Sequence, residues 1–329
     1  MSVRREVSIV SPSGAVVEGE LYRGLARLKE AGWTAKVPDG TGERHFVFAG
    51  SDARRARQMW NAAWDESTDV VWASRGGYGA ARILPELERL TLSEGTPPPK
   101  LLCGFSDITA LHEFVMSRWG WSSLHCDVPC ASNFTAMPAT EWEATLAMVR
   151  GEPSAKPAWA ETTLVSLGGG GGEVLNDLDG RLVGGNLTVL TSMVGTPFAM
   201  DNAGGRLLFL EDVSEAPYRL DRYLNQLWQS GAMRGVRAVI LGTFEDCDDS
   251  PGSTVLPSGE KVQTRSKMET PEWMRHVFGE FSRASRIPVV ATLPVGHGSE
   301  RAPLPLGAKY RLTGSGKLEL LEWDWLRRA

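Results

Sequence analysis

Short apolar segments alternate with amphipathic segments of helical length along the first half of the chain, and this alternation limits the possible folds more than any other feature. Residues 20–31 carry leucines at helical spacing up to Gly32, and Ser51 can cap a helix over residues 52–64. Short strands separated by such helices are typical of an α/β fold in which helices cover both faces of a mainly parallel sheet. The predicted strands are residues 7–10, 33–37 and 69–73, the apolar segment from Leu101, and residues 121–128.

The second half of the chain has a different pattern, in which strands predominate. One clear helix, with Pro217 in its first turn, carries leucines along one face. Residues 246–270 are polar and contain Pro and Gly, which predicts a mobile surface loop or lid. The predicted strands are residues 180–189, 206–211, 236–244 and 289–293, followed by a hairpin over 309–323.

Two domains are expected, because 329 residues exceed the size at which a single core stops growing. Between Pro153 and Gly172 the periodicity fades. The five successive glycines at 168–172 cannot all lie within a helix or strand without a large entropic cost. We therefore expect an α/β domain over residues 1–155, a Gly-rich linker over 156–172, and a β-rich domain over 173–329.

Charge and hydropathy narrow the class of partner. The net charge is −5 and no basic stripe is interleaved with aromatic residues, which argues against nucleic acid and for a small substrate. No apolar run is long enough to cross a bilayer, and the start lacks the apolar segment of a secretory signal. We expect a cytoplasmic protein without membrane insertion. The twelve tryptophans could line a peptide or sugar cleft, although buried packing is the default for most of them.

The sequence predicts no cofactor and no metal. The four cysteines lack paired C-x-x-C spacing and are expected to be reduced thiols. His125, Cys126, Asp127 and Cys130 could be considered as metal ligands, but the chain offers no second clustered pair of ligands. The glycine-rich corner at residues 75–79 has neither the spacing of a P-loop nor that of a dinucleotide fingerprint.

Ser106 lies where an apolar strand turns sharply, through Gly104 and Phe105, into a helical segment. Such a corner exposes the serine oxygen and points the first free N–H groups of the helix at negative charge that develops beside it. Acyl-transfer enzymes present their nucleophile in this way. A serine before a helix can equally be a simple N-cap, so the partners of the hydroxyl decide between the two interpretations.

A serine nucleophile needs a histidine that takes its proton. His297 is favoured, because it follows an apolar strand and is flanked by glycines, although a solvated loop histidine would have the same pattern. His125 ends a short strand. A role in the core, or in support of the site, is as compatible with this position as the role of general base. His112 is turned away from the serine by helical rotation, whereas His45 and His276 lie in charged, exposed segments.

An apolar strand ends in Glu211 and Asp212, and a buried carboxylate there requires a partner. Accepting the N–H of a histidine would compensate its burial. Either acid could instead favour the start of the next helix through the helix dipole, and Asp212 suits that role better. The chain order Ser106, Glu211, His297 is allowed because a triad is defined by geometry, but it requires one cleft shared by both halves of the chain.

Seven segments in order resemble the LD-carboxypeptidases, a family of serine peptidases that includes the muropeptide carboxypeptidase and the microcin C immunity peptidase. The resemblance runs almost from end to end. The segments are Ser-Pro-Ser-Gly (11–14), Phe-Ala-Gly-Ser-Asp (48–52), Arg-Gly-Gly-Tyr-Gly (75–79), Gly-Phe-Ser-Asp-Ile-Thr (104–109), Gly-Gly-Asn-Leu (184–187), Leu-Glu-Asp (210–212) with Glu-Ala-Pro-Tyr-Arg (215–219), and Gly-His-Gly (296–298).

The resemblance implies an N-terminal α/β domain that carries the nucleophile and a smaller, β-rich C-terminal domain that carries the acid and the base. By motif, Ser106 corresponds to the nucleophile, Glu211 to the acid that orients the histidine, and His297 to the general base. The N–H groups of Gly77 and Asp107 correspond to the oxyanion hole, which suits an acyl tetrahedral intermediate. The family also implies a homodimer.

The predicted activity is that of a serine carboxypeptidase, which hydrolyses an amide next to a terminal carboxylate, as when a muropeptide tetrapeptide loses its terminal D-alanine. Arg75 could grip that carboxylate bidentately or form a structural ion pair instead. The alternative substrate is a peptidyl- or aminoacyl-nucleotide, whose base the tryptophans and the insertion could stack. A second alternative is a catalytically inactive binding module, which would bind a muropeptide but whose serine would not be acylated. Residues 124–129 depart from the family's usual His-Gly-Pro-like segment. This departure and the insertion over residues 246–270 affect the predicted substrate more than the predicted reaction.

Overall fold

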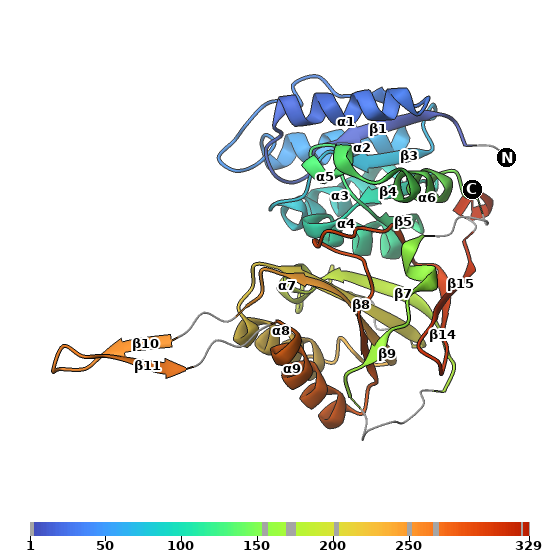
Figure 1. The fold of residues 1–329 in the computed structure, drawn as a ribbon. Coiled ribbons are helices and arrows are strands. Elements are labelled where there is room, and N and C mark those ends of the chain that lie inside the picture. Colours follow the sequence, from blue (N-terminus) through green and yellow to red (C-terminus); the bar gives the residue numbers. More distant parts are fainter. Residues whose placement is uncertain are drawn as a thin grey trace.

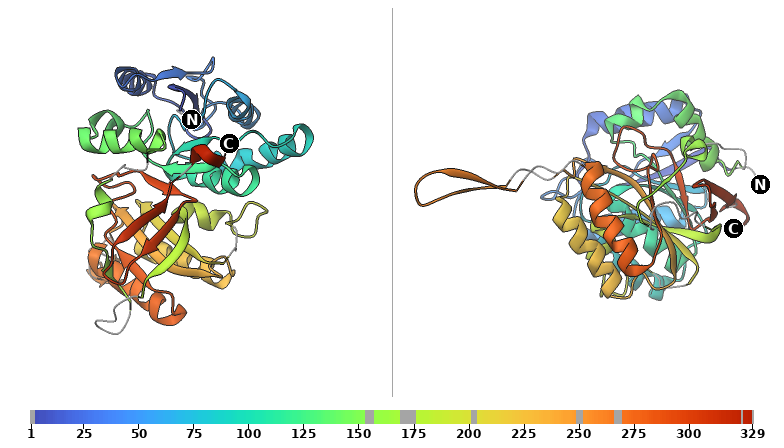
Figure 2. Two further views of the ribbon diagram at one scale, coloured as in Figure 1. Left: turned by 90° about the vertical axis from the view of Figure 1, so that its right-hand side faces the viewer. Right: turned by 60° about the horizontal axis from the view of Figure 1, so that its bottom comes forward.

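The computed structural model describes residues 3–152, 157–168, 176–200, 204–248, 252–265, 270–323 and 325–328. Two large sheets with flanking helices lie one above the other in Figure 1, the first half of the chain (blue to green) above and most of the second half (yellow to red) below. The left view of Figure 2 shows the same two layers from the side. This arrangement confirms the predicted α/β class.

The first sheet has the strand order β13-β5-β4-β3-β1-β2. Strands β1 to β5 run parallel, as expected from the alternation of strands and helices. Side chains along β3 and β4 alternate between two cores, with Val71 and Leu102 in one and Trp72 and Cys103 in the other. Both faces are therefore buried, as is usual for parallel strands. The strands are β1 (Glu6–Val10), β2 (Thr34–Lys36), β3 (Val70–Ala73), β4 (Leu101–Gly104), β5 (Ser122–His125) and β13 (Leu304–Leu306).

Helices from the first half of the chain cover both faces of this sheet. Met59 of α2 and Leu87 of α3 pack in the core on one side, and Leu28 of α1 and Phe134 of α5 pack in the core on the other. The predicted cap is confirmed, because Ser51 accepts a hydrogen bond from the N–H three residues on. The helices are α1 (Glu18–Glu30), α2 (Asp52–Trp64), α3 (Ala80–Glu94), α4 (Thr109–Phe114), α5 (Ser132–Ala136) and α6 (Ala139–Val149), with shorter 3₁₀ turns η1 (Ser106–Ile108) and η3 (Ala158–Glu161) and a π turn η2 (Val115–Trp119).

The second sheet is mixed, with the order β15-β14-β7-β8-β9-β12-β6. Its central strands β7, β8, β9 and β12 run parallel, and the outer strands β14, β15 and β6 are antiparallel to their neighbours. Strand β8 is buried almost throughout, which places its C-terminal carboxylates inside the molecule. The strands are β6 (Val165–Ser166), β7 (Leu178–Asn186), β8 (Arg206–Val213), β9 (Val236–Glu245), β12 (Val289–Ala291), β14 (Lys309–Leu312) and β15 (Leu318–Glu322).

The prediction of one helix in the second half was wrong, because the described residues there form three α-helices. They are α7 (Leu187–Ser192), α8 (Pro217–Gln229) and α9 (Thr270–Ser285), besides the 3₁₀ turn η4 (Trp325–Arg328). Pro217 begins α8 as expected. Helix α9 had a usable signal, since Trp273, Val277 and Phe281 recur at helical spacing and pack in the core.

Within the insertion over residues 246–270, most of the residues that the structure describes do not form an irregular loop. Residues 252–265 form an antiparallel hairpin of β10 (Gly252–Val255) and β11 (Lys261–Arg265), which projects from the body of the molecule in Figures 1 and 2. The N–H of Leu256 donates to the carbonyl of Glu260 at 2.8 Å and closes the turn. A turn that contains Pro257 and Gly259 between two short β-prone runs is a hairpin signal that the polar composition concealed.

The two sheets exchange strands across the predicted domain boundary. Strand β6, which lies within the predicted linker, pairs with β12 in the second sheet. Strand β13, from the C-terminal segment, pairs with β5 and extends the first sheet. Of the five glycines at 168–172, only Gly168 lies within the described residues. The C-terminal segment thus ties both layers together.

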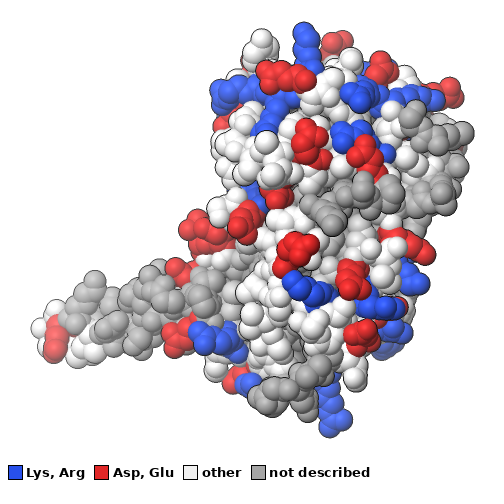
Figure 3. Space-filling view, turned by 45° about the vertical axis from the view of Figure 1, so that its right-hand side comes forward, with Lys and Arg blue, Asp and Glu red and all other residues white. Residues whose placement is uncertain are grey.

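Most tryptophans pack in the interior, as predicted, and only Trp64 and Trp228 are exposed. On the face seen in Figure 3, basic and acidic side chains are intermingled. Among the helices that the structure describes, none combines the length and apolar character that crossing a bilayer requires.

Candidate active site

Ser106 lies at the corner between β4 and the turn η1, and its backbone has φ 64°. A non-glycine residue in this left-handed region is strained, and such strain is concentrated at functional sites. Gly76 makes room for it, because a Cβ at residue 76 would lie 2.8 Å from the Ser106 Cβ. Phe105, not Ser106, holds the cap position, and no side-chain hydrogen bond caps η1 or α4. The simple N-cap interpretation is therefore wrong.

The Asp107 carboxylate locks this corner to two other loops. It is buried, and it accepts hydrogen bonds from Ser13 Oγ at 2.5 Å and from the N–H of Ala80, the first residue of α3, at 2.8 Å. Burial raises the pKa of Asp107 despite these donors. The N–H of Gly14 also donates to the carbonyl of Gly76 at 3.1 Å. Three segments that are distant in the sequence therefore converge around the serine.

Glu211 and His297 form a close ion pair near this corner. His297 Nδ1 lies 2.6 Å from Glu211 Oε2, and the Glu211 side chain is fully buried in β8. Burial alone would raise the pKa of Glu211, but the charge of His297 and the nearby imidazole donors lower it to about 2. Burial would lower the pKa of His297, and the Glu211 carboxylate outweighs this and raises it. An ionised carboxylate at this distance holds the proton on Nδ1 and leaves Nε2 as the free acceptor.

Thr243 of β9 fixes the loop that carries the histidine, a contact that sequence reasoning missed. Its Oγ1 accepts a hydrogen bond from the N–H of Gly298 at 3.0 Å. The backbone of Gly296 has φ 131°, and a Cβ there would lie 2.4 Å from Thr243 Oγ1 and 3.0 Å from Glu211 Oε2. Only glycine permits this approach of loop to acid. Close packing against Thr243 and Glu211 therefore explains why glycines flank His297.

His125 lies on the other side of the same carboxylate. Its Nε2 is 4.0 Å from Glu211 Oε1, and among the described residues neither buried atom has a hydrogen-bond partner. The rings of His125 and His297 both pack on Phe105, at centroid distances of 5.8 and 4.7 Å. The supporting role considered for His125 fits this placement.

Phe105 brings the two halves of the chain together, since it precedes Ser106 and contacts the ring of His297. The structure therefore brings the acid and the base into direct contact and packs the base against the residue before the serine. Within the described part of the chain, no hydrogen bond joins the Ser106 hydroxyl to His297. Catalytic hydrogen bonds are commonly looser before substrate binds.

A cavity of about 310 Å³ opens at the serine and contains Arg75 and Gly77 in its wall. Arg75 Nη1 donates to the carbonyl of Ala15 at 2.7 Å, and no described carboxylate pairs with it. The structural ion pair considered for Arg75 is thus absent from the described residues. Asn133 and Arg301, which sequence reasoning missed, also line the cavity.

Arg301 follows the loop that carries His297 and connects this loop to the layer that contains the first sheet. Its guanidinium donates to Asp127 Oδ1 at 3.1 Å and to the carbonyls of Gly298 and His297, both at 2.9 Å. It also lies over the Phe105 ring, 5.4 Å from the centroid. The only available signal was an arginine shortly after the Gly-His-Gly segment.

Asp212 acts on a different helix from the one expected. It accepts hydrogen bonds from the N–H and hydroxyl of Thr188 at 2.9 and 2.8 Å and from Asn186 Nδ2 at 3.0 Å. These groups lie at the start of α7, so the expectation that Asp212 favours the following helix was wrong. Burial, with the charge of Glu211, raises the pKa of Asp212 to about 6.

His112 is buried directly beneath the corner, where its Nε2 lies 2.9 Å from the carbonyl of Gly104. His45 and His276 are exposed, as expected. Burial lowers the pKa of His112 to about 3. A histidine kept neutral in the folded state costs stability as pH falls below its unfolded value near 6.5, because only the unfolded chain takes up the proton.

We therefore predict that the stability advantage of the wild-type protein over His112→Asn shrinks as pH falls from about 6.5 toward 3, by about 1.4 kcal/mol per pH unit. Urea unfolding of both proteins at several pH values measures this difference. A difference that stays constant across this range would contradict the assignment.

A buried carboxylate–imidazole pair beside a serine at a strand-to-helix corner, on a two-layer α/β fold, is the arrangement of a serine-type hydrolase. Residues 7–126 match the family model of the LD-carboxypeptidase N-terminal domain, and residues 179–312 match that of the LD-carboxypeptidase C-terminal domain. The chain belongs to the LD-carboxypeptidase family.

Individual relatives agree with this membership. The murein tetrapeptide carboxypeptidase of Pseudomonas aeruginosa is 30% identical over 311 residues, which cover 94% of this chain and 93% of that protein. The crystal structure of muramoyltetrapeptide carboxypeptidase from Oxalobacter formigenes has a TM-score of 0.70 and 29% identity, over 96% of this chain and 97% of that one. The microcin C7 self immunity protein MccF shares the fold, with a TM-score of 0.75 at 20% identity and 98% coverage of both chains.

Proposed function

We propose that this protein is a serine LD-carboxypeptidase in which Ser106, His297 and Glu211 form the catalytic triad. The observation that carries the proposal is the 2.6 Å contact between His297 Nδ1 and the fully buried Glu211, on a loop packed against the residue before Ser106. A carboxylate kept ionised in this position orients the imidazole and stabilises the imidazolium that forms during the reaction.

The reaction begins when Ser106 Oγ attacks the scissile carbonyl carbon and His297 Nε2 takes the hydroxyl proton. The N–H groups of Gly77 and Asp107 would hold the resulting oxyanion. Collapse of the tetrahedral intermediate breaks the C–N bond, and His297 returns the proton to the leaving amine. A water molecule, activated by the same imidazole, then hydrolyses the acyl-enzyme. No step requires a metal or a cofactor.

The proposed substrate is a muropeptide tetrapeptide that loses its terminal D-alanine. Relatives named as murein or muramoyl tetrapeptide carboxypeptidases support this choice. Arg75 supports it too, because it lies in the wall of the Ser106 cavity without a carboxylate partner among the described residues and can bind the terminal carboxylate. No tryptophan is among the residues that line this cavity, so the stacking platform expected for a nucleotide substrate lacks support there. We further propose a cytoplasmic homodimer, on the family resemblance alone.

Product analysis distinguishes the two substrate classes. The protein is incubated with a muropeptide tetrapeptide and, separately, with a peptidyl-adenylate mimic, and the products are identified by mass spectrometry. We expect loss of one alanine from the tetrapeptide and no cleavage of the nucleotide compound. Cleavage of the nucleotide compound alone would overturn the proposed substrate, and cleavage of neither would overturn the proposed function.

A further inference from the structure

Phe46 lies at the tip of a tight turn in the loop between β2 and α2, and it is 79% exposed. His45 and Phe48 each donate their N–H to the other's carbonyl at 3.0 Å, which closes a two-residue turn over Phe46 and Val47. Phe46 has φ 57°, whereas the φ of Val47 is not positive. A turn with a positive φ at its first central residue alone normally has glycine there. A phenylalanine at this position is strained and gains little from burial, so the fold alone does not explain it.

Three aromatic rings form a row that leads from this turn to the proposed oxyanion hole. The Phe46 ring lies 6.3 Å from the Phe48 ring, and the Phe48 ring lies 5.5 Å from the Tyr78 ring. Phe48 is buried, with the guanidinium of Arg82 5.1 Å from its ring centroid. Tyr78 is 58% exposed and directly follows Gly77. Phe46 and Tyr78 are therefore the exposed ends of an aromatic row whose centre is fixed by packing.

Backbone and side-chain hydrogen bonds join the turn to the wall of the Ser106 cavity. The N–H of Ala15 donates to the carbonyl of Val47 at 2.8 Å, and the carbonyl of Ala15 accepts from Arg75 Nη1 at 2.7 Å. Arg75 lines the cavity at the serine. The aromatic row is thus held in a fixed position relative to the reacting groups, as a preorganised binding surface requires.

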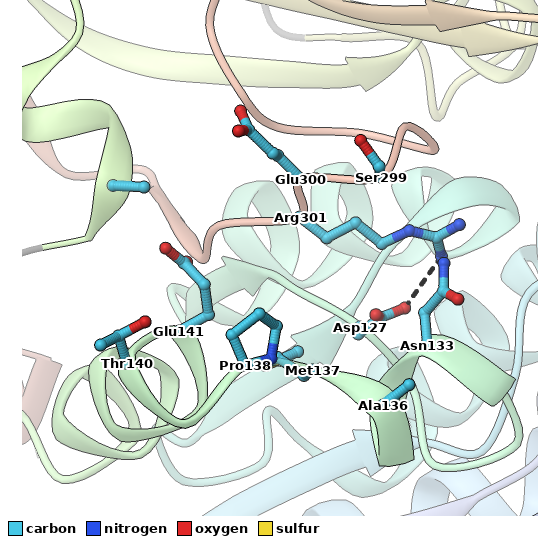
Figure 4. A pocket seen from close by; sticks show the side chains of 11 residues that line it. Asp127, Asn133, Ala136, Met137, Pro138, Thr140, Glu141, Ser299, Glu300 and Arg301 are labelled. Atoms are coloured by element: carbon cyan, nitrogen blue, oxygen red, sulfur yellow. Dashed lines mark hydrogen bonds and ion pairs between the residues drawn. The ribbon is translucent and has the colours of Figure 1, made fainter.

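The wall of the cavity at the serine differs from one part to another. Asn133 and Arg301 line one part, where the guanidinium donates to Asp127 Oδ1 at 3.1 Å and the Asn133 amide oxygen accepts from Nη2 at 2.7 Å (Figure 4). These hydrogen bonds occupy the guanidinium and join the two layers. Residues 75–77 line another part, and the chain continues from them to the exposed Tyr78. A peptide that passes the oxyanion hole on this side meets exposed aromatic surface.

The length of the aromatic row matches the part of the proposed substrate that precedes the scissile bond. In a muropeptide tetrapeptide, three residues lie between the sugar and the bond to the terminal D-alanine. Three extended residues span about 10 Å, and the two steps of 6.3 and 5.5 Å along the row cover a similar length. The sugar can therefore reach the Phe46 end of the row while the scissile carbonyl lies at the N–H of Gly77.

The chemistry of the surface around Phe46 suits a sugar ring. The faces of a pyranose carry C–H groups that pack on aromatic rings, whereas its edges carry hydroxyl groups that need polar neighbours. Arg44, whose Nε donates to the carbonyl of Phe46 at 2.9 Å, and His45 are exposed beside the ring. Glu43 is exposed in the same loop. The turn thus presents one aromatic face with polar side chains next to it.

We propose that Phe46 and Tyr78 form a subsite for the sugar of the muropeptide substrate, with an aromatic face packed on the C–H face of the sugar ring. This inference rests on the proposed carboxypeptidase function and adds a second point of recognition to the one at the scissile bond. The sugar lies away from the reacting atoms, so the subsite contributes equally to ground-state and transition-state binding. It should therefore lower KM and leave kcat almost unchanged.

Two tetrapeptides that end in D-alanine test the subsite, one with an N-acetylmuramoyl group and one with an acetyl group on the amine of the first residue. The release of D-alanine gives kcat and KM for each peptide. We expect the wild-type protein to prefer the muramoyl peptide in kcat/KM by on the order of tenfold, which corresponds to about 1.4 kcal/mol. In Phe46→Gly, whose glycine accepts φ 57° without strain, this preference should fall by roughly threefold or more. Turnover of the acetyl peptide by the same sample shows that the variant is folded.

Phe46→Tyr keeps the aromatic ring and should keep the preference for the muramoyl peptide. Leu92→Ala is the matched control for an exposed apolar side chain, because Leu92 is 81% exposed near the end of α3 that is distant from Tyr78. It should also keep the full preference. Equal kcat/KM values of the wild-type protein for both peptides would overturn the sugar subsite and leave the carboxypeptidase function standing. A full preference that survives in Phe46→Gly would overturn it as well.

Light scattering on the wild-type protein and Phe46→Gly tests the other possible occupant of the aromatic row, a second copy of the chain. We expect the same molecular mass for both proteins. A lower mass of the variant would assign the row to a contact between subunits and overturn the subsite. If neither peptide releases D-alanine, the proposed function fails and the sugar subsite with it.

Discussion

Replacement of Ser106 by alanine is expected to lower kcat by on the order of 10⁵–10⁶-fold and to leave the fold intact. The hydroxyl is the only nucleophile proposed for the reaction, so its loss removes the covalent step entirely. Alanine keeps the Cβ that packs near Gly76, and the Ser106 hydroxyl forms no hydrogen bond with the described residues. We therefore expect the free energy of unfolding to stay within about 0.5 kcal/mol of wild type.

Release of D-alanine from a tetrapeptide measures the activity, and urea unfolding measures the stability. Ser106→Gly provides a second inactive variant, which should be no less stable because glycine accepts φ 64° without strain. Ser192→Ala serves as the active control, since Ser192 is exposed on α7 and does not line the Ser106 cavity. Full turnover by Ser106→Ala would remove the nucleophile from the proposal.

The fold was predictable where local periodicity determines the structure. The predicted strand over residues 69–73 contains β3, and residues 101–104 form β4; within β3 and β4 the residues are apolar or glycine, because strands buried on both faces have no polar positions. Strand β13 was not predictable, since its Leu-Pro-Leu sequence has no strand pattern and its pairing with β5 joins residues far apart in the chain. The hairpin of β10 and β11 and helix α9 had local signals that the polar surroundings concealed.

The candidate site also contains residues that the sequence could predict and residues that it could not. Ser106 and His297 each follow an apolar strand, where loop residues of α/β folds carry function, and Glu211 lies near the C-terminal end of another apolar strand, so the sequence could indicate each of them separately. Thr243 and Arg301 were missed because their importance lies in contacts between distant segments. Thr243 holds the N–H of a residue 55 positions away, and Arg301 pairs with an aspartate 174 positions away. Periodicity and motif spacing contain no information about such contacts.

Glu211→Gln is expected to lower kcat/KM by on the order of 10⁴-fold, although glutamine has nearly the same shape. The buried carboxylate accepts the Nδ1 proton of His297 at 2.6 Å and so leaves Nε2 free to take the serine proton. A glutamine that turns its NH₂ toward Nδ1 would favour the opposite tautomer, with the proton on Nε2. It would also provide no charge to stabilise the imidazolium.

The pH dependence separates this loss from a simple packing defect. In the wild-type protein the Glu211 carboxylate raises the pKa of His297, so kcat/KM should rise with pH through a value above 6.5 as the imidazole becomes neutral. In Glu211→Gln burial and the charge of Arg301 still lower the pKa of His297, and only the weaker effect of Asp212 opposes them, so the pKa should move below that value. NMR titration of the His297 ring in both proteins measures the shift directly. Because a packing defect alone would leave the carboxylate's effect in place, an unchanged pKa in the variant would show that Glu211 does not control the base.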